Sequence, residues 1–186
     1  MASIVVPFRA ASAKRRLEPL DDDARTELAH RMLAKVIAAA TAVGPTILVT
    51  EPEATGARAV AAEHGATVVD DPGGGQGAAV GAGLRAISEW PVLVVNADLP
   101  QVQPRDLLAL LGAMPEDGIA IAPAADGTTN ALALAKAGLF EPLYGPGSAA
   151  RFRAHAEDRE IDVMELAAPA LVRDVDTVAE LAHVAR

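Results

Sequence analysis

Val92-Leu-Val-Val-Asn-Ala-Asp98-Leu-Pro100 is the stretch of this sequence that says most about its fold. Its uninterrupted apolar run predicts a strand over residues 91–96 that is buried on both faces, since a half-exposed strand alternates apolar with polar residues. Strands of that kind occur in parallel sheets that helices cover on both sides. The run leads directly into an aspartate, and Pro100 prevents the strand from continuing.

The same pattern continues on both sides of this strand. Four more strands are predicted at residues 3–8, 46–50, 66–70 and 118–123. Amphipathic helices are predicted at residues 22–42, 53–64, 76–89 and 104–113, with Gly65 as a C-terminal cap and Pro104 in a first turn. Later elements are strands at 130–135 and 161–166, a helix from about 148 to 156, a strand from 171 to 175 and a helix at 177–185.

Strands that alternate with helices form βαβ units, so we predict an α/β fold with a single doubly wound, mostly parallel sheet and helices on both faces. No linker or repeat divides the 186 residues, which therefore form one predicted domain, 1–186. In open sheets of this class, ligands bind beyond the carboxyl ends of the strands. The loops at that edge are therefore the expected functional site.

Composition excludes several classes of function. The formal net charge of −9 argues against a nucleic-acid surface, and the absence of cysteine excludes thiolate nucleophiles and Cys-based metal sites. We find no signal peptide and no apolar run near the roughly 20 residues of a membrane span, so we expect a cytoplasmic protein without a membrane partner. Whether it forms a homo-oligomer stays open.

The first loop carries a local excess of positive charge. Arg9, Lys14, Arg15 and Arg16 all precede the acidic run that starts at Asp21. A basic loop on an acidic protein suits a small anionic ligand, and we interpret Lys14 and Arg16 as a phosphate clamp. The alternative is a solvated basic turn that pairs with the acidic run.

A glycine-rich segment, Asp71-Pro-Gly-Gly-Gly-Gln-Gly77, follows the third strand and begins a helix. Glycines let a ligand approach the backbone, and a helix start offers free N–H groups to an anion, so Gly75, Gln76 and Gly77 are candidate nucleotide contacts. A flexible turn is the plain alternative. A dinucleotide fingerprint fits poorly, because Val80 stands where a small residue is required.

Two acidic positions are candidate ligands of a divalent cation. Asp98 lies too far before Pro104 to cap the following helix, which favours a role as a ligand of a hard cation. Asp174 is the predicted second ligand. Asp176 precedes Thr177-x-x-Glu180, a capping box, and is predicted to cap the last helix or to support the metal site. Mg²⁺ is the cofactor that two carboxylates and substrate phosphates usually hold.

Two further segments could bind an acceptor. Gly127-Thr-Thr-Asn130 leads into a strand, and Tyr144-Gly-Pro-Gly-Ser148 leads into a helix, with Ser148 as its predicted N-cap. Asn130 and Ser148 could contact phosphate or carboxylate oxygens. Ordinary capping and turn chemistry is the equally open alternative.

Taken together, five segments resemble the 2-phospho-L-lactate / phosphoenolpyruvate guanylyltransferase family. They are Val6-Pro-Phe with Ala13-Lys-Arg-Arg-Leu17, Ala97-Asp-Leu-Pro100, Asp126-Gly-Thr-Thr-Asn-Ala-Leu132, Tyr144-Gly-Pro-Gly-Ser-Ala-Ala-Arg-Phe152 and Asp174-Val-Asp-Thr177. This family serves the biosynthesis of coenzyme F-420 and has a fold like that of the molybdenum-cofactor guanylyltransferases. The resemblance covers nearly the whole chain.

The resemblance implies a role for each candidate residue. Mg²⁺ would be bound by Asp98 and Asp174, GTP by the nucleotide-binding set Arg9, Lys14, Arg16, Gly75, Gln76 and Gly77, and a small phosphorylated three-carbon acid by Asn130, Gly145 and Ser148. The expected reaction moves GMP from GTP to the phosphate of phosphoenolpyruvate or 2-phospho-L-lactate, with Asp98, Asp174 and Lys14 as the catalytic groups. The alternatives are another acceptor (a molybdopterin or a sugar phosphate), an NAD-dependent oxidoreductase and a regulatory nucleotide-binding module.

Overall fold

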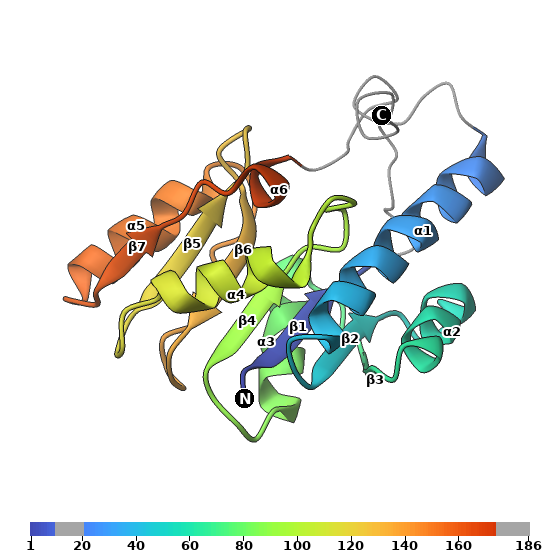
Figure 1. The fold of residues 1–186 in the computed structure, drawn as a ribbon, viewed down its shortest axis with the longest axis horizontal. Coiled ribbons are helices and arrows are strands. Elements are labelled where there is room, and N and C mark those ends of the chain that lie inside the picture. The colour runs from blue at the N-terminus through green and yellow to red at the C-terminus, as the bar shows by residue number, and fades with distance from the viewer. Residues whose placement is uncertain (10–20, 174–186) are drawn as a thin grey trace.

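The computed structural model describes residues 1–9 and 21–173 of the chain. Within these residues, seven strands form one sheet in the order β3-β2-β1-β4-β6-β5-β7 (Figure 1). The strands are β1 (Ser3–Pro7), β2 (Thr46–Thr50), β3 (Thr67–Asp70), β4 (Val92–Val95), β5 (Ile119–Pro123), β6 (Thr129–Leu134) and β7 (Val163–Glu165). The helices are α1 (Asp22–Thr41), α2 (Thr55–Glu63), α3 (Gln76–Ala86), α4 (Pro104–Ala113), α5 (Ser148–Asp158) and α6 (Pro169–Val172).

One strand runs against all the others. β6 pairs antiparallel with both β4 and β5, whereas the remaining pairs of neighbours are parallel. The start of β6 therefore lies at the edge where the parallel strands end. The backbone N–H of Asn96, directly after β4, donates to the carbonyl of Asn130 at a distance of 2.8 Å. This reversal brings a polar residue from the beginning of a strand into the predicted ligand-binding edge.

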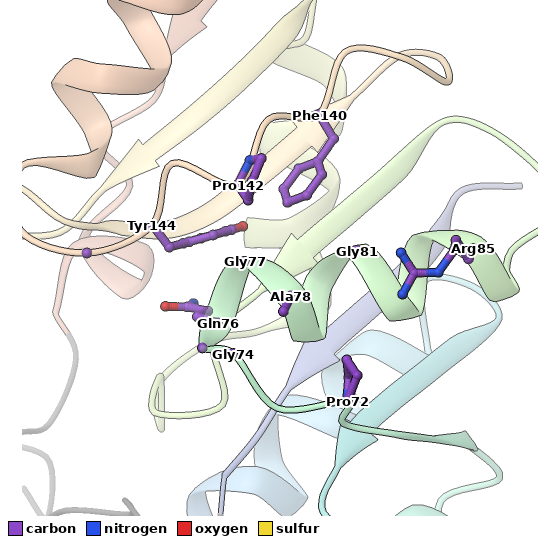
Figure 2. Close-up of a pocket in the computed structure, with 12 residues that line it drawn as sticks. Pro72, Gly74, Gln76, Gly77, Ala78, Gly81, Arg85, Phe140, Pro142 and Tyr144 are labelled. Atoms are coloured by element: carbon purple, nitrogen blue, oxygen red, sulfur yellow. The ribbon is translucent and has the colours of Figure 1, made fainter.

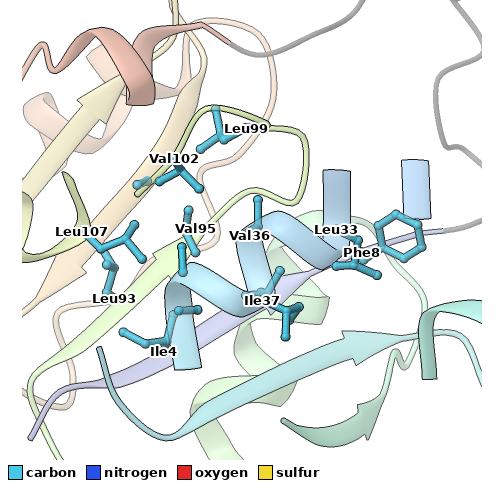
Figure 3. Close-up of a cluster of buried hydrophobic side chains, with 14 of the residues drawn as sticks. Ile4, Phe8, Leu33, Val36, Ile37, Leu93, Val95, Leu99, Val102 and Leu107 are labelled. Carbon is cyan, nitrogen blue, oxygen red and sulfur yellow. The ribbon is translucent and has the colours of Figure 1, made fainter. Parts of the chain in front are cut away.

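The sheet is covered on both faces, as predicted. Successive residues of a strand point to opposite faces, so Leu93 and Val95 of β4 pack into one core and Val92 and Val94 into the other. Figure 3 shows the first core, where α1 lies across the sheet. Each fully buried aliphatic side chain of this kind stabilises the fold by roughly 1.5–3 kcal/mol.

The second face is covered by α3 and α5. Helix α3 lies close to the sheet because Gly83 has no side chain: a Cβ atom there would lie 2.5 Å from Cγ1 of Val5 and 3.0 Å from Cγ2 of Val49. This close packing brings the second half of α3 against β1 and β2. The glycine-rich loop directly precedes the same helix.

The end of the described chain differs from the prediction. Residues 171 and 172 do not start a strand but end the short helix α6, whose Pro169 occupies its first turn. Pro169 favours this position because its fixed φ suits a helix start and its missing N–H is not needed there. The carbonyl of Ala168 accepts from the N–H groups of Leu171 and Val172 at 2.9 and 3.0 Å. The rest of the predicted strand and the helix at 177–185 lie outside the described residues.

Candidate active site

Asp98 lies in the turn that follows β4, at the carboxyl edge of the sheet. The turn is anchored by the fully buried side chain of Leu99. The carboxylate does not cap the next helix, as predicted: the N-cap of α4 is Gln103, whose N–H donates to Asp106 Oδ2 at 2.9 Å. Asp98 is half-buried, and its Oδ1 atom is fully shielded from solvent.

Of the predicted metal ligands, Asp98 lies among the described residues. A shielded carboxylate oxygen at the ligand-binding edge is the hard donor that Mg²⁺ prefers, so Asp98 fits this ion. Residues 1–9 and 21–173 contain no group of three acidic, His or Cys side chains that could hold a metal ion by themselves. The predicted partners Asp174 and Asp176 lie outside the described residues. The shared magnesium site therefore stays a prediction.

The described chain nevertheless ends at this same edge. The carbonyl of Leu171 accepts from Asn130 Nδ2 at 2.9 Å, and the carbonyl of Val172 accepts from the N–H of Ala125 at 3.2 Å. These bonds tie Leu171 to the start of β6 and Val172 to the segment after β5. The described residues therefore end in the part of the sheet that also carries Asp98.

Arg9 is joined to the loop after β3 by an ion pair. Its Nε donates to Asp71 Oδ2 at 2.7 Å, and the Asp71 side chain is only 1% exposed. The hydrogen bond from Arg9 lowers the pKa of Asp71, the Gly73 N–H also lowers it, and burial opposes both. The same bond raises the pKa of Arg9. The ion pair holds the loops after β1 and β3 together, and the predicted contact of Arg9 with the nucleotide stays a prediction.

The glycine-rich loop reaches α3 through a left-handed backbone. Gly73, Gly74 and Gly75 have φ values of 81°, 87° and 98°, a region that other residues rarely adopt. Gly75 is the N-cap and provides no side chain to cap the helix. The N–H groups of the first turn therefore point beyond the helix start and are suited to bind an anion. Lys14 and Arg16, the predicted clamp, lie outside the described residues.

A cleft of about 740 Å³ lies beside the start of α3. One wall is α3 itself, and the other is the loop that carries Phe140, Pro142 and Tyr144 (Figure 2). The walls approach closely at Gly77, where a Cβ atom would lie 2.6 Å from Cβ of Pro142. The cleft thus runs between the predicted nucleotide residues Gly75, Gln76 and Gly77 and the predicted acceptor residue Gly145, all of which line it.

Tyr144 brings a buried hydroxyl group to this cleft. Among the described residues the hydroxyl has no hydrogen-bond partner, and burial raises its pKa, so it remains protonated at neutral pH. The ring packs edge-on against Phe152, with centroids 5.3 Å apart. Arg151 Nη2 supports the same loop by donating to the carbonyls of Leu143 and Tyr144 at 2.7 and 3.0 Å.

Asn130 and Ser148 lie near the cleft but are deeply buried, with exposed fractions of 1% and 0%. Asn130 Nδ2 donates to Leu171, and Ser148 Oγ donates to Thr129 Oγ1 at 3.0 Å. Ser148 is the first residue of α5 rather than its N-cap, because the left-handed Gly147 takes that position. The protein itself therefore provides partners for both side chains, and their contact with an acceptor stays a prediction.

Sequence reasoning did not single out three residues of this edge: Asn96, Asp71 as the partner of Arg9, and Tyr144 as a cleft residue. Asn96 accepts from Gln76 Nε2 at 2.7 Å. A signal was present for Asn96 and Asp71, since each is a polar residue placed directly after a strand. Tyr144 gave no such signal, because an aromatic residue in a loop is more often part of a core.

Comparison with known proteins finds relatives along nearly the whole chain. The family model for CofC-like guanylyl transferases matches residues 2–185. A phosphoenolpyruvate guanylyltransferase of Sphaerobacter thermophilus is 38% identical over 97% of this chain and 91% of its own length. A 2-phospho-L-lactate guanylyltransferase of Halomicrobium mukohataei is 39% identical over 97% of this chain and 84% of its own length.

Solved structures show the same fold. A nucleotide-diphospho-sugar transferase-like protein of Desulfovibrio desulfuricans G20 has a TM-score of 0.81 at 16% identity, over 100% of this chain and 86% of its own. A nucleotidyl transferase of Methanothermobacter has a TM-score of 0.69 at 18% identity, over 99% of this chain and 95% of its own. From the match over residues 2–185 and the identity to both relatives, the chain belongs to the CofC-like guanylyltransferase family.

Proposed function

We propose that this chain transfers GMP from GTP to the phosphate of a small phosphorylated three-carbon acid, phosphoenolpyruvate or 2-phospho-L-lactate, in coenzyme F-420 biosynthesis. The observation that carries the proposal is the convergence of the Arg9–Asp71 pair, the start of α3, Asp98 and Asn130 at one edge of the sheet in a chain of this family. Four different strands contribute to that edge. It lies beside a cleft whose two walls, α3 and the loop with Phe140, Pro142 and Tyr144, would each receive one substrate.

The donor would occupy the α3 side of the cleft. A Cβ atom at Gly73 or Gly75 would meet nothing within 4 Å, so the glycine-rich loop would let a base and ribose approach the backbone, and the first-turn N–H groups of α3 suit a phosphate oxygen. Lys14 and Arg16 would offset the charge of the leaving pyrophosphate. These positions favour a nucleoside triphosphate over a neutral ligand.

Chemistry at this edge would need positioning and charge neutralisation rather than a covalent nucleophile. An oxygen of the acceptor phosphate forms a bond to the α-phosphorus of GTP, the bond from that phosphorus to the β-phosphate oxygen breaks, and pyrophosphate leaves with the electron pair. Asp98, with Asp174 and Asp176, would hold Mg²⁺, which when bound supplies charge neutralisation and Lewis acidity at the phosphates. A phosphate monoester has a second pKa near 6, so the acceptor needs no general base at neutral pH.

The decisive assay offers GTP and Mg²⁺ with a panel of acceptors and detects the product by mass. The panel contains phosphoenolpyruvate, 2-phospho-L-lactate, 3-phosphoglycerate and glucose 1-phosphate. We expect a guanylylated product with one or both of the first two and release of an equal amount of pyrophosphate. Turnover only with the sugar phosphate, or none with any acceptor, would contradict the proposal.

A further inference from the structure

Three side-chain amides form a continuous hydrogen-bonded chain beneath the candidate site. Gln76 Nε2 donates to Asn96 Oδ1 at 2.7 Å, and Asn96 Nδ2 donates to Asn130 Oδ1 at 3.3 Å. Asn130 Nδ2 then donates to the carbonyl of Leu171 at 2.9 Å. The chain thus connects the start of α3, the end of β4, the start of β6 and the end of α6.

Backbone carbonyls determine the direction of this chain. A carbonyl only accepts hydrogen bonds, so Leu171 requires the Nδ2 group of Asn130 on its side, which turns Oδ1 of Asn130 towards Asn96. Asn96 Nδ2 also donates to the carbonyl of Thr129 at 3.1 Å, which turns Asn96 Oδ1 towards Gln76. Gln76 is therefore held by its Nε2 group, and within residues 1–9 and 21–173 no donor is bonded to its Oε1 atom, in a residue that lines the cleft.

Asn96 is the central member, since it alone bonds to an amide side chain on each side. Gln76 lies on the nucleotide wall of the cleft, and Asn130 belongs to the segment predicted to meet the acceptor. Losing Asn96 would leave Gln76 Nε2 without its acceptor and Oδ1 of the buried Asn130 without its donor, although Leu171 would still hold Asn130 Nδ2. Both substrate subsites would then lose order together, although neither substrate needs to touch Asn96.

We propose that Asn96 is a positioning residue that orients Gln76 towards the nucleotide and holds the buried Asn130 in place at the start of β6, in the segment predicted to meet the acceptor, and so couples the two subsites. The inference rests on the proposed function for the identity of the two ligands. The role of Asn96 can be tested independently of that function, because binding of GTP with Mg²⁺ is measurable without an acceptor and without turnover.

The test is a double-mutant cycle on Asn96 and Gln76. Asn96→Ala is expected to raise the dissociation constant for GTP with Mg²⁺, measured by calorimetry, by about tenfold, the effect of one lost hydrogen bond. It is also expected to raise KM for phosphoenolpyruvate by a similar factor while kcat changes less. Gln76→Ala is expected to weaken the binding of GTP without changing KM for phosphoenolpyruvate. Adding Asn96→Ala to Gln76→Ala should weaken the binding of GTP little further.

Thr46→Val is the matched control. It removes a buried hydrogen bond of 2.9 Å to the carbonyl of Gly44, at the opposite edge of the sheet. This variant should lower the thermal midpoint and leave both substrate constants unchanged. Asn96→Ser, which is too short to reach both neighbours, takes the place of Asn96→Ala if that variant does not fold.

The proposal is overturned if the Asn96 variant keeps both substrate constants within twofold of the wild type. It is equally overturned if the effects of Asn96→Ala and Gln76→Ala on GTP binding simply add. A wild-type protein that binds GTP but transfers GMP to no acceptor refutes the proposed function, while the binding cycle still decides the role of Asn96.

Discussion

Asp98 is the residue on which the proposed chemistry depends most directly. Asp98→Asn keeps the shape of the side chain but removes its charge, so we expect kcat to fall by about 10²–10³-fold or more, as for the loss of one group that stabilises a transition state. The fold should persist, with a thermal midpoint within a few degrees of the wild type. Steady-state kinetics and thermal unfolding measure the two effects separately.

The control for that variant is Asp106→Asn. Asp106 lies near the same edge but serves the capping box of α4. Its substitution should cost about 0.5–2 kcal/mol of stability through the weakened cap and leave kcat unchanged. Near-normal activity of Asp98→Asn, or an equal loss in Asp106→Asn, would refute the catalytic assignment.

The Arg9–Asp71 pair makes a prediction about pH. Because the folded pKa of Asp71 lies below its unfolded value, its stabilisation is fully present above the unfolded pKa of about 4 and is lost as pH falls through the lower, folded pKa. Asp71→Asn should therefore unfold more easily than the wild type at pH 7, by about 1 kcal/mol, because Arg9 is 35% exposed and solvent screens the pair. Urea unfolding at pH 7 and at pH 2.5 should show the larger difference at pH 7, because the charge of Asp71 is progressively lost as the pH falls.

Asp22→Asn provides a comparison for the pair, because Asp22 pairs with Arg25 on α1 and its side chain is 90% exposed. Its effect at pH 7 should be below about 0.5 kcal/mol. If the Asp71 variant differed from the wild type equally at both pH values, its cost would come from packing and not from charge.

Among the elements, α3 lies close to the sheet because Gly83 has no side chain. Gly83→Ala would place a methyl group 2.5 Å from Val5, so we expect a loss of about 1–3 kcal/mol despite the better helix propensity of alanine. Gly112→Ala in α4 meets no atom within 4 Å and should instead stabilise the fold by about 0.5–1 kcal/mol. Chemical unfolding of the two variants should give opposite signs; two gains would mean that α3 can move away from the sheet without cost.

The elements were largely predictable from the sequence, because their signals are local. The continuous apolar run before Asn96 predicts β4 from its own residues. In the same way, Pro104 predicts the start of α4. Residues 171 and 172 were assigned wrongly, since an apolar pair does not distinguish a strand from a helix and Pro169 decided the outcome. The amide chain through Asn96 was not predictable, because it depends on the reversed direction of β6, and pairing order is not visible in a single strand.

For the whole molecule, binding of the nucleotide should couple to stability. GTP with Mg²⁺ at about 100 times its dissociation constant should stabilise the folded state by about 2.7 kcal/mol, or roughly 5–10 °C for a domain of this size. NADH should produce no shift, since the glycine-rich segment lacks a dinucleotide fingerprint. A shift with NADH and none with GTP would favour an oxidoreductase.

Among the helices in residues 1–9 and 21–173, none has both the length and the apolar character that a membrane span requires.

The most direct test follows the fate of each phosphate of GTP. The protein is incubated with Mg²⁺ and phosphoenolpyruvate or 2-phospho-L-lactate, and with GTP labelled at either the α- or the γ-phosphate. The account predicts that the α label moves to the acceptor, while the γ label appears only in pyrophosphate. Transfer of the γ label to the acceptor, or release of pyrophosphate at the same rate without an acceptor, would contradict guanylyl transfer.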